Sequence, residues 1–225
     1  LSAMAQGLFA TLIIGTIIQQ IGSFIPGQAG TILFVIGKVA ASLTGAGIGV
    51  AVAYKFNESP LVVVSAATAG MTGAFASKLL AGTVLVDGAM VYSGPGEPLG
   101  AFLAAYVGIY FGHLVSGKTK VDILVTPIVS IGTGSAVGLI LGPPISGFMV
   151  WLGSVINWGT EQQPFLMGII VSVLMGMILT LPISSAALGI ILNLSGLAAG
   201  AATIGCCCNM VGFAVASYRE NKIGG

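Results

Sequence analysis

Long apolar segments without acidic or basic residues constrain this chain more than any other feature of its sequence. Met4–Phe24 and Phe165–Leu181 contain no Asp, Glu, Lys or Arg, and a helix needs about 20 mostly apolar residues to cross a bilayer. Of the 225 residues, 56% are hydrophobic and 6% are charged, against roughly 25% charged residues in a soluble domain. The sequence therefore predicts an all-α integral membrane protein that lies in the lipid bilayer.

We expect a polytopic protein with about eight transmembrane helices, because helices satisfy their own backbone hydrogen bonds within lipid. The predicted helices are residues 4–24, 31–54, 61–80, 99–115, 121–141, 145–156, 165–181 and 195–217. Gly142-Pro143-Pro144 is predicted to end the fifth helix, and Pro182 to separate the seventh from a half-helix at residues 183–194. No soluble domain or long linker is visible, so residues 1–225 are predicted to form a single membrane-embedded domain.

The connectors between the predicted helices distribute their charges asymmetrically. If the half-helix does not cross, the connector lysines and arginines all lie on one face: Lys55, Lys118, Lys120, Arg219 and Lys222. The opposite connectors have no Lys or Arg, and their acidic residues are Asp87, Glu97 and Glu161. Since positive loops stay in the cytoplasm, both termini are predicted to be cytoplasmic.

A cluster of side chains able to hydrogen-bond a hydroxylated solute lies between two apolar segments. A carboxylate near apolar helices is costly unless it faces a cavity or a partner, so Glu161 is the leading candidate ligand. Its oxygens can accept from sugar hydroxyls, and Trp158 offers an apolar face to a sugar ring. The other candidates in this cluster are Asn157, Thr160 and Gln162. The alternative is an ordinary external turn with an interfacial tryptophan.

Two further polar residues interrupt predicted helices. His113 is a candidate for solute binding or for a proton or phosphoryl relay, and the alternative is a histidine bonded to a neighbouring carbonyl. Lys38 is a candidate for solute binding that could counter Glu161 or Asp87 in the interior, and the alternative is a lysine without a role in the site.

Several function classes find no support in the sequence. It contains no P-loop, no metal-ligand spacing and no nucleophile–base arrangement. We therefore predict no catalytic, cofactor-binding or metal-binding residues, and no enzyme activity of the chain alone. A net charge of +1 argues against nucleic acid as a partner. The three adjacent cysteines, Cys206–Cys208, cannot form a disulfide framework and are predicted to be small packing residues.

Segments spread over the whole chain indicate a family. They are residues 121–127 (VDILVTP), 142–144 (GPP), 157–161 (NWGTE), 180–187 (TLPISSAA) and 211–221 (VGFAVASYREN). Together they resemble a compact class of IIC components (EIIC) of the bacterial phosphoenolpyruvate-dependent sugar phosphotransferase system. The resemblance implies a multi-pass permease of the bacterial inner membrane that binds a sugar and presents it to a cytoplasmic IIB phosphocarrier. Sugar phosphotransferase activity then requires the partner IIA and IIB proteins.

The resemblance has further implications. Larger sugar permeases of the system have a Gly-Ile-Thr-Glu-Pro turn with a sugar-binding glutamate, and residues 159–164 are similar, without the isoleucine and with the proline two residues further on. Members of the class continue beyond the last matching segment, so the C-terminus is either natural or truncated. A homodimer is expected from the family and from the small-residue helix faces. An orphan transporter, channel or sensor for another small solute is the alternative function.

Overall fold

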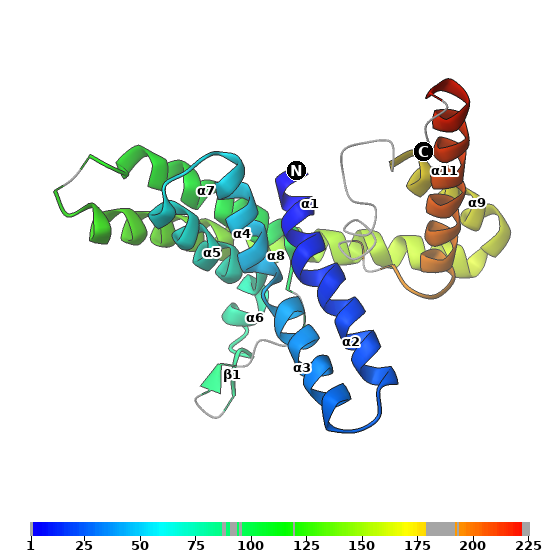
Figure 1. Ribbon diagram of the computed structural model, residues 1–225, viewed down its shortest axis with the longest axis horizontal. Helices are drawn as coiled ribbons and strands as arrows, with labels where there is room; N and C mark the ends of the chain where they lie inside the picture. Colours follow the sequence, from blue (N-terminus) through cyan, green and yellow to red (C-terminus); the bar gives the residue numbers. More distant parts are fainter. Residues whose placement is uncertain are drawn as a thin grey trace. The chain divides into compact units, whose positions relative to one another are not determined.

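The computed structural model describes residues 2–86, 89–90, 94, 96–118, 120–178, 192 and 194–221. These residues are almost all helical, apart from an antiparallel pair of two-residue strands, β1 (Leu85–Val86) and β2 (Ala89–Met90). The predicted helical class is confirmed (Figure 1). The chain divides into two compact units: residues 3–147, and residues 148–225 with the first two residues. Whether the chain is a single domain stays a prediction.

The first unit begins with a close helical hairpin. Its elements are α1 (Ser2–Leu8), the π-helix η1 (Phe9–Ile13), α2 (Ile14–Phe24) and α3 (Gln28–Ser42). Gly27, with a φ of 92°, lies in the turn, and α3 returns along α2 (Figure 1). A Cβ atom on Gly15 would lie 2.9 Å from the carbonyl oxygen of Gly37. The hairpin therefore needs glycine where its two backbones touch.

Four further helices follow, and three of them build the core of this unit. They are α4 (Thr44–Lys55), α5 (Pro60–Ala74), α6 (Ala76–Leu80) and α7 (Pro98–Val115). A bend of 55° at Leu43 separates α4 from α3. The helices α4, α5 and α7 pack against one another. Their contact surfaces bury Ile48, Val52, Val62, Ala66, Ala69, Ala101, Ala104 and Ala105. Small side chains let these helices lie close together.

Helix α8 (Asp122–Gln162) has 41 residues and contains Pro127, Pro143 and Pro144. The prediction that Gly142-Pro143-Pro144 ends a helix is therefore wrong. A proline removes one backbone donor, and membrane proteins tolerate this loss where neighbouring groups satisfy the freed carbonyls. The first part of α8 belongs to the first unit. There the Ser130 hydroxyl donates to the Gly108 carbonyl oxygen over 2.8 Å, which fixes α8 against α7.

The second unit contains the end of α8, with α9 (Pro164–Ile178) and α11 (Gly196–Asn221). Helices α9 and α11 pack around the buried side chains of Val171, Met175 and Ala202. The Cys206 sulfur lies 3.8 Å from the Met175 carbonyl oxygen, whereas Cys207 and Cys208 are exposed. Of the three predicted packing cysteines, Cys206 therefore lies at a helix contact.

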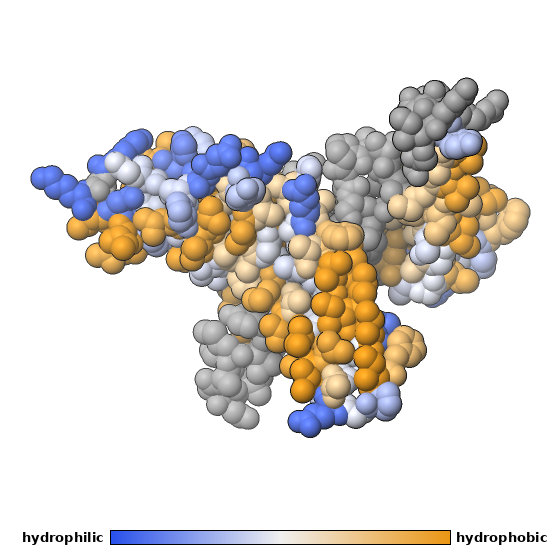
Figure 2. Space-filling model, viewed as in Figure 1, coloured by the Kyte–Doolittle hydropathy of each residue, from blue (hydrophilic) through white to orange (hydrophobic). Residues whose placement is uncertain are grey.

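Large apolar side chains cover the outer surface of the α2–α3 hairpin (Figure 2). They include Ile17, Ile21, Ile32, Val35 and Val39. Among the described residues, four helices are long and apolar enough to cross a membrane: 2–24, 98–115, 122–162 and 196–216. The bent pair α3–α4 makes a fifth if it is one crossing. An exposed apolar surface of this extent is typical of a protein in lipid.

The predicted count of about eight crossings is not confirmed by these helices. Helices α5 and α9 have 15 residues each, fewer than the roughly 20 that a crossing needs. Helix α8 joins the two helices predicted at 121–141 and 145–156. The predicted break at Pro182 lies outside the described residues, as do Asp87, Lys222 and all of the predicted half-helix except residues 192 and 194.

Candidate functional site

The turn between α4 and α5 has a geometry that fixes the position of Glu58. Asn57 has a φ of 55°, a left-handed conformation that Asn tolerates better than most residues. The Asn57 amide donates to the Tyr54 carbonyl oxygen over 3.0 Å, and the Glu58 amide donates to the Ala53 carbonyl oxygen over 3.3 Å. These two bonds form the Schellman motif of a helix end. Pro60 then begins α5, so Glu58 is held between a capped helix end and a proline.

Glu58 faces His113 of α7. The His113 Nδ1 atom lies 3.0 Å from one carboxylate oxygen of Glu58 and 3.1 Å from the other. The Glu58 side chain is only 9% exposed, whereas the imidazole is 71% exposed. Next to this pair, the hydroxyls of Ser59 and Ser116 lie 3.0 Å apart. Two polar contacts therefore join the α4–α5 turn to the end of α7.

A pocket of about 270 Å³ lies at this pair. Its lining residues are Phe56, Glu58, Tyr106, Ile109, Tyr110 and His113. The last four share one face of α7, because residues three and four apart are neighbours on a helix. The ring centroids of Phe56 and Tyr106 lie 6.0 Å apart. The pocket thus combines a hydrogen-bond acceptor, an imidazole and apolar ring faces, a combination suited to a small hydroxylated solute.

The cluster predicted at residues 157–162 is helical and does not form a turn. It forms the end of α8, and α9 begins at Pro164 after a break at Gln163. Thr160 is buried, and its hydroxyl donates to the Ile156 carbonyl oxygen over 2.8 Å. Helix α8 therefore continues to Gln162, past the point where the polar composition predicts a connector, and the Thr160 hydroxyl bonds within its own helix.

The other predicted ligands of this cluster lie in the second unit with different surroundings. The Asn157 side-chain oxygen accepts from the Ser195 amide over 3.2 Å. The exposed side chains are Trp158, Glu161 and Gln162. The structure therefore places Asn157 beside the start of α11 and leaves Trp158, Glu161 and Gln162 accessible within this unit. Their role as solute ligands stays a prediction.

The remaining predicted residues lie in the first unit. Lys38 is exposed on α3 and does not line the pocket of His113. His113 does line it, and its carboxylate partner Glu58 was missed in the sequence, where it reads as part of a short connector. The charge pattern could have identified Glu58 as a partner of His113. Glu58 and the end of the helix that contains His113 are both predicted on the lysine-rich face.

The apolar helices, and the aromatic-lined pocket that contains Glu58 and His113, define a helical membrane protein with a candidate solute site. The family described as Phosphotransferase system, EIIC matches residues 1–225. The chain therefore belongs to this family, and the resemblance seen in the sequence is confirmed. EIIC components are membrane transport proteins of the phosphotransferase system, which in general have a sugar substrate and a IIB partner. No curated protein matches the chain.

Proposed function

We propose that this chain is the sugar-translocating subunit of a phosphotransferase system, which binds a sugar and presents it to a cytoplasmic IIB protein for phosphorylation. Family membership over residues 1–225 supports the permease role. The observation that supports sugar binding is the Glu58–His113 contact inside an aromatic-lined pocket. We place this pocket at the cytoplasmic end of the helices, because Lys55 and Lys118 flank it in sequence and positive connectors stay in the cytoplasm.

The proposed chemistry assigns a role to each group of the pocket. A sugar hydroxyl donates to the Glu58 carboxylate while the rings of Phe56 and Tyr106 contact the apolar face of the sugar. IIB then supplies a phosphoryl group from its phosphocysteine or phosphohistidine. The sugar oxygen forms the new O–P bond, the S–P or N–P bond of IIB breaks, and the hydroxyl proton passes to Glu58. His113 orients the carboxylate for this step. The phosphotransferase activity therefore belongs to the chain only together with IIA and IIB.

Glu161 remains the alternative sugar ligand, with the surrounding Asn157, Trp158, Thr160 and Gln162. We favour Glu58 because its carboxylate is largely buried and lines a pocket. The Glu161 side chain is exposed within its own unit. The proposal also includes a multi-pass arrangement in the bacterial inner membrane, cytoplasmic termini and a homodimer, which the small-residue helix surfaces favour.

Uptake into membrane vesicles tests the proposed function. Vesicles containing the chain should accumulate a labelled sugar as its phosphate when phosphoenolpyruvate, the general phosphotransferase proteins and the cognate IIA and IIB are supplied. Omission of phosphoenolpyruvate should abolish accumulation, because the phosphoryl group drives retention. Equal uptake with and without phosphoenolpyruvate contradicts the proposal and favours an orphan transporter or channel. The absence of any uptake across a panel of sugars favours a sensor.

A further inference from the structure

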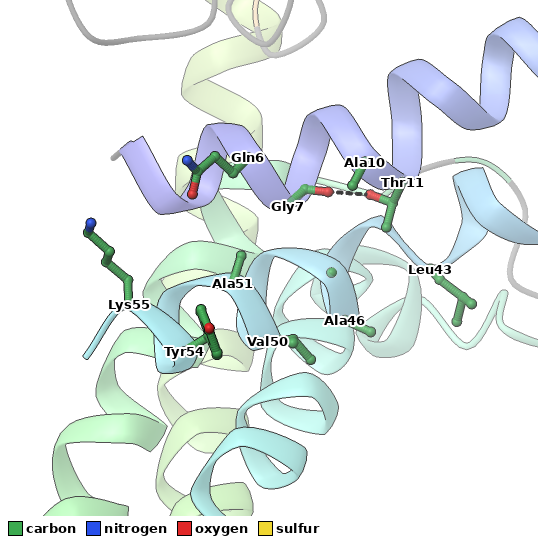
Figure 3. A pocket seen from close by; sticks show the side chains of 11 residues that line it. Gln6, Gly7, Ala10, Thr11, Leu43, Ala46, Val50, Ala51, Tyr54 and Lys55 are labelled. Carbon is green, nitrogen blue, oxygen red and sulfur yellow. Dashed lines mark hydrogen bonds between the residues drawn. The ribbon is translucent and has the colours of Figure 1, made fainter. Parts of the chain in front are cut away.

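A second cavity, away from the Glu58–His113 pocket, lies in the first unit between the first helical segment and α4. It is a groove of about 600 Å³ (Figure 3). On one side it is lined by α1 and η1, and on the other by α4 from the bend at Leu43 to Lys55. At a rise of 1.5 Å per residue, this stretch of α4 is about 18 Å long. The hydrocarbon of one leaflet is about 15 Å thick.

The interior of the groove is apolar, and many of the residues that line it are small. A Cβ atom on Gly7 would overlap the carbonyl group of Gly47, so α1 and α4 touch there through their backbones. Ala46 and Ala51 line the groove without filling it. The Thr11 hydroxyl donates to the Gly7 carbonyl oxygen over 2.8 Å, so it is satisfied within its own helical segment. The groove therefore offers van der Waals contact along most of its length.

The polar side chains of the groove gather at one end. Figure 3 shows Gln6, Tyr54 and Lys55 toward one end and Leu43 toward the other. Lys55 is exposed at the last position of α4, and no carboxylate of the described residues forms an ion pair with it. Tyr54 is 77% exposed beside it. Tyrosine and lysine side chains in this arrangement are typical of the membrane–water interface.

We propose that this groove binds one phospholipid with an anionic headgroup. The acyl chain lies along α4 between Lys55 and Leu43, and the headgroup phosphate contacts the Lys55 ammonium. Three observations lead to this occupant: an apolar lining, a length close to that of one leaflet, and a cation at the polar end. The anionic lipids of a cytoplasmic leaflet attract such a cation. A second copy of the chain is the alternative occupant of the groove, and the experiments below distinguish it from a lipid.

Native mass spectrometry of the full chain, purified in a neutral detergent, tests the proposal. Phosphatidylglycerol and phosphatidylcholine with identical acyl chains are titrated in parallel. Phosphatidylglycerol should bind more tightly, and Lys55→Gln should weaken its binding about fivefold with little change for phosphatidylcholine. Lys118→Gln is the matched control, since Lys118 is an exposed lysine outside the groove, and it should change neither affinity. Soluble glycerol phosphate should not compete.

Filling the groove tests the acyl-chain part of the proposal. Ala51→Phe should weaken the binding of both lipids, with the circular dichroism spectrum unchanged. If this variant does not fold, the Lys55→Gln and Lys118→Gln comparison decides the proposal. Equal phosphatidylglycerol binding by wild type and Lys55→Gln overturns it, as does competition by glycerol phosphate. A dimer that Ala51→Phe dissociates without any change in lipid binding also overturns it and assigns the groove to a second copy.

Discussion

The Nδ1 atom of His113 on α7 lies within 3.1 Å of both carboxylate oxygens of Glu58 in the α4–α5 turn. These two residues are far apart in sequence, and the packing of α4, α5 and α7 brings them together. The carboxylate is largely buried and the imidazole is largely exposed. A solute that enters the pocket can therefore reach a carboxylate whose orientation is already fixed.

The two residues should act as one unit in transport. Glu58→Gln and His113→Gln should each lower phosphoenolpyruvate-dependent uptake. We expect the double variant to lose less than the product of the two single losses, because both residues hold the same contact. Uptake rates of the four proteins in vesicles measure this coupling. Multiplicative losses would show that the two side chains work independently.

The left-handed conformation of Asn57 should be necessary for the position of Glu58. Asn57→Gly should preserve uptake, because glycine adopts a positive φ without strain. Asn57→Val should destabilise the chain by about 1–2 kcal/mol, since its branched side chain disfavours the φ of 55°. It should also lower uptake by displacing Glu58. The measurements are the unfolding midpoint in detergent and the uptake rate, and full activity of Asn57→Val contradicts the role of the turn.

Glycine at the α4–α5 contact should be required for stability. A Cβ atom on Gly49 would overlap the carbonyl group of Ala66, so Gly49→Ala should destabilise the chain by about 1–3 kcal/mol. Gly132→Ala is the matched control, because no atom lies within 4 Å of its added Cβ. It should be neutral or stabilise α8 by up to about 1 kcal/mol. Thermal unfolding in detergent compares the two variants, and equal midpoints would exclude close backbone contact at Gly49.

The proposed topology predicts which sites are accessible from each side of the membrane. After replacement of the three native cysteines, a cysteine introduced at Lys120 should react with an impermeant maleimide only from the cytoplasm. A cysteine at Asp87 should react only from outside. One at Lys222 should behave like Lys120 if residues 183–194 do not cross. Opposite reactivity at Lys120 and Lys222 would remove the half-helix assignment.

The sequence predicts the helices of this fold better than their bends. Apolar length predicts α7 within one residue, at 99–115 against Pro98–Val115. The bend at Leu43 has no proline or glycine at that position to mark it. The opposite error occurs at Pro143 and Pro144, where strong helix breakers lie inside α8. In neither case does the local sequence pattern alone predict the path of the backbone.

The candidate site is only partly visible in the sequence. His113 was identified because a polar residue in an apolar helix is costly. Glu58 was not, because its role depends on the Asn57 turn and on the packing of distant helices. Thr160 was named as a candidate ligand from its type, and the structure shows that its hydroxyl donates to a carbonyl of its own helix. The type of a residue indicates which groups its side chain can bind, and the fold determines which groups lie next to it.

The most direct test of sugar binding at Glu58 is calorimetric titration of the purified chain with the sugar identified in the uptake assay. Glu58→Gln should weaken binding roughly 10- to 100-fold, because a charge-assisted hydrogen bond to the sugar is lost. Glu97→Gln, which changes a carboxylate outside the pocket, should bind like wild type. Unchanged affinity of Glu58→Gln contradicts the account. Loss of affinity in Glu161→Gln instead would move the site to the cluster at residues 157–162.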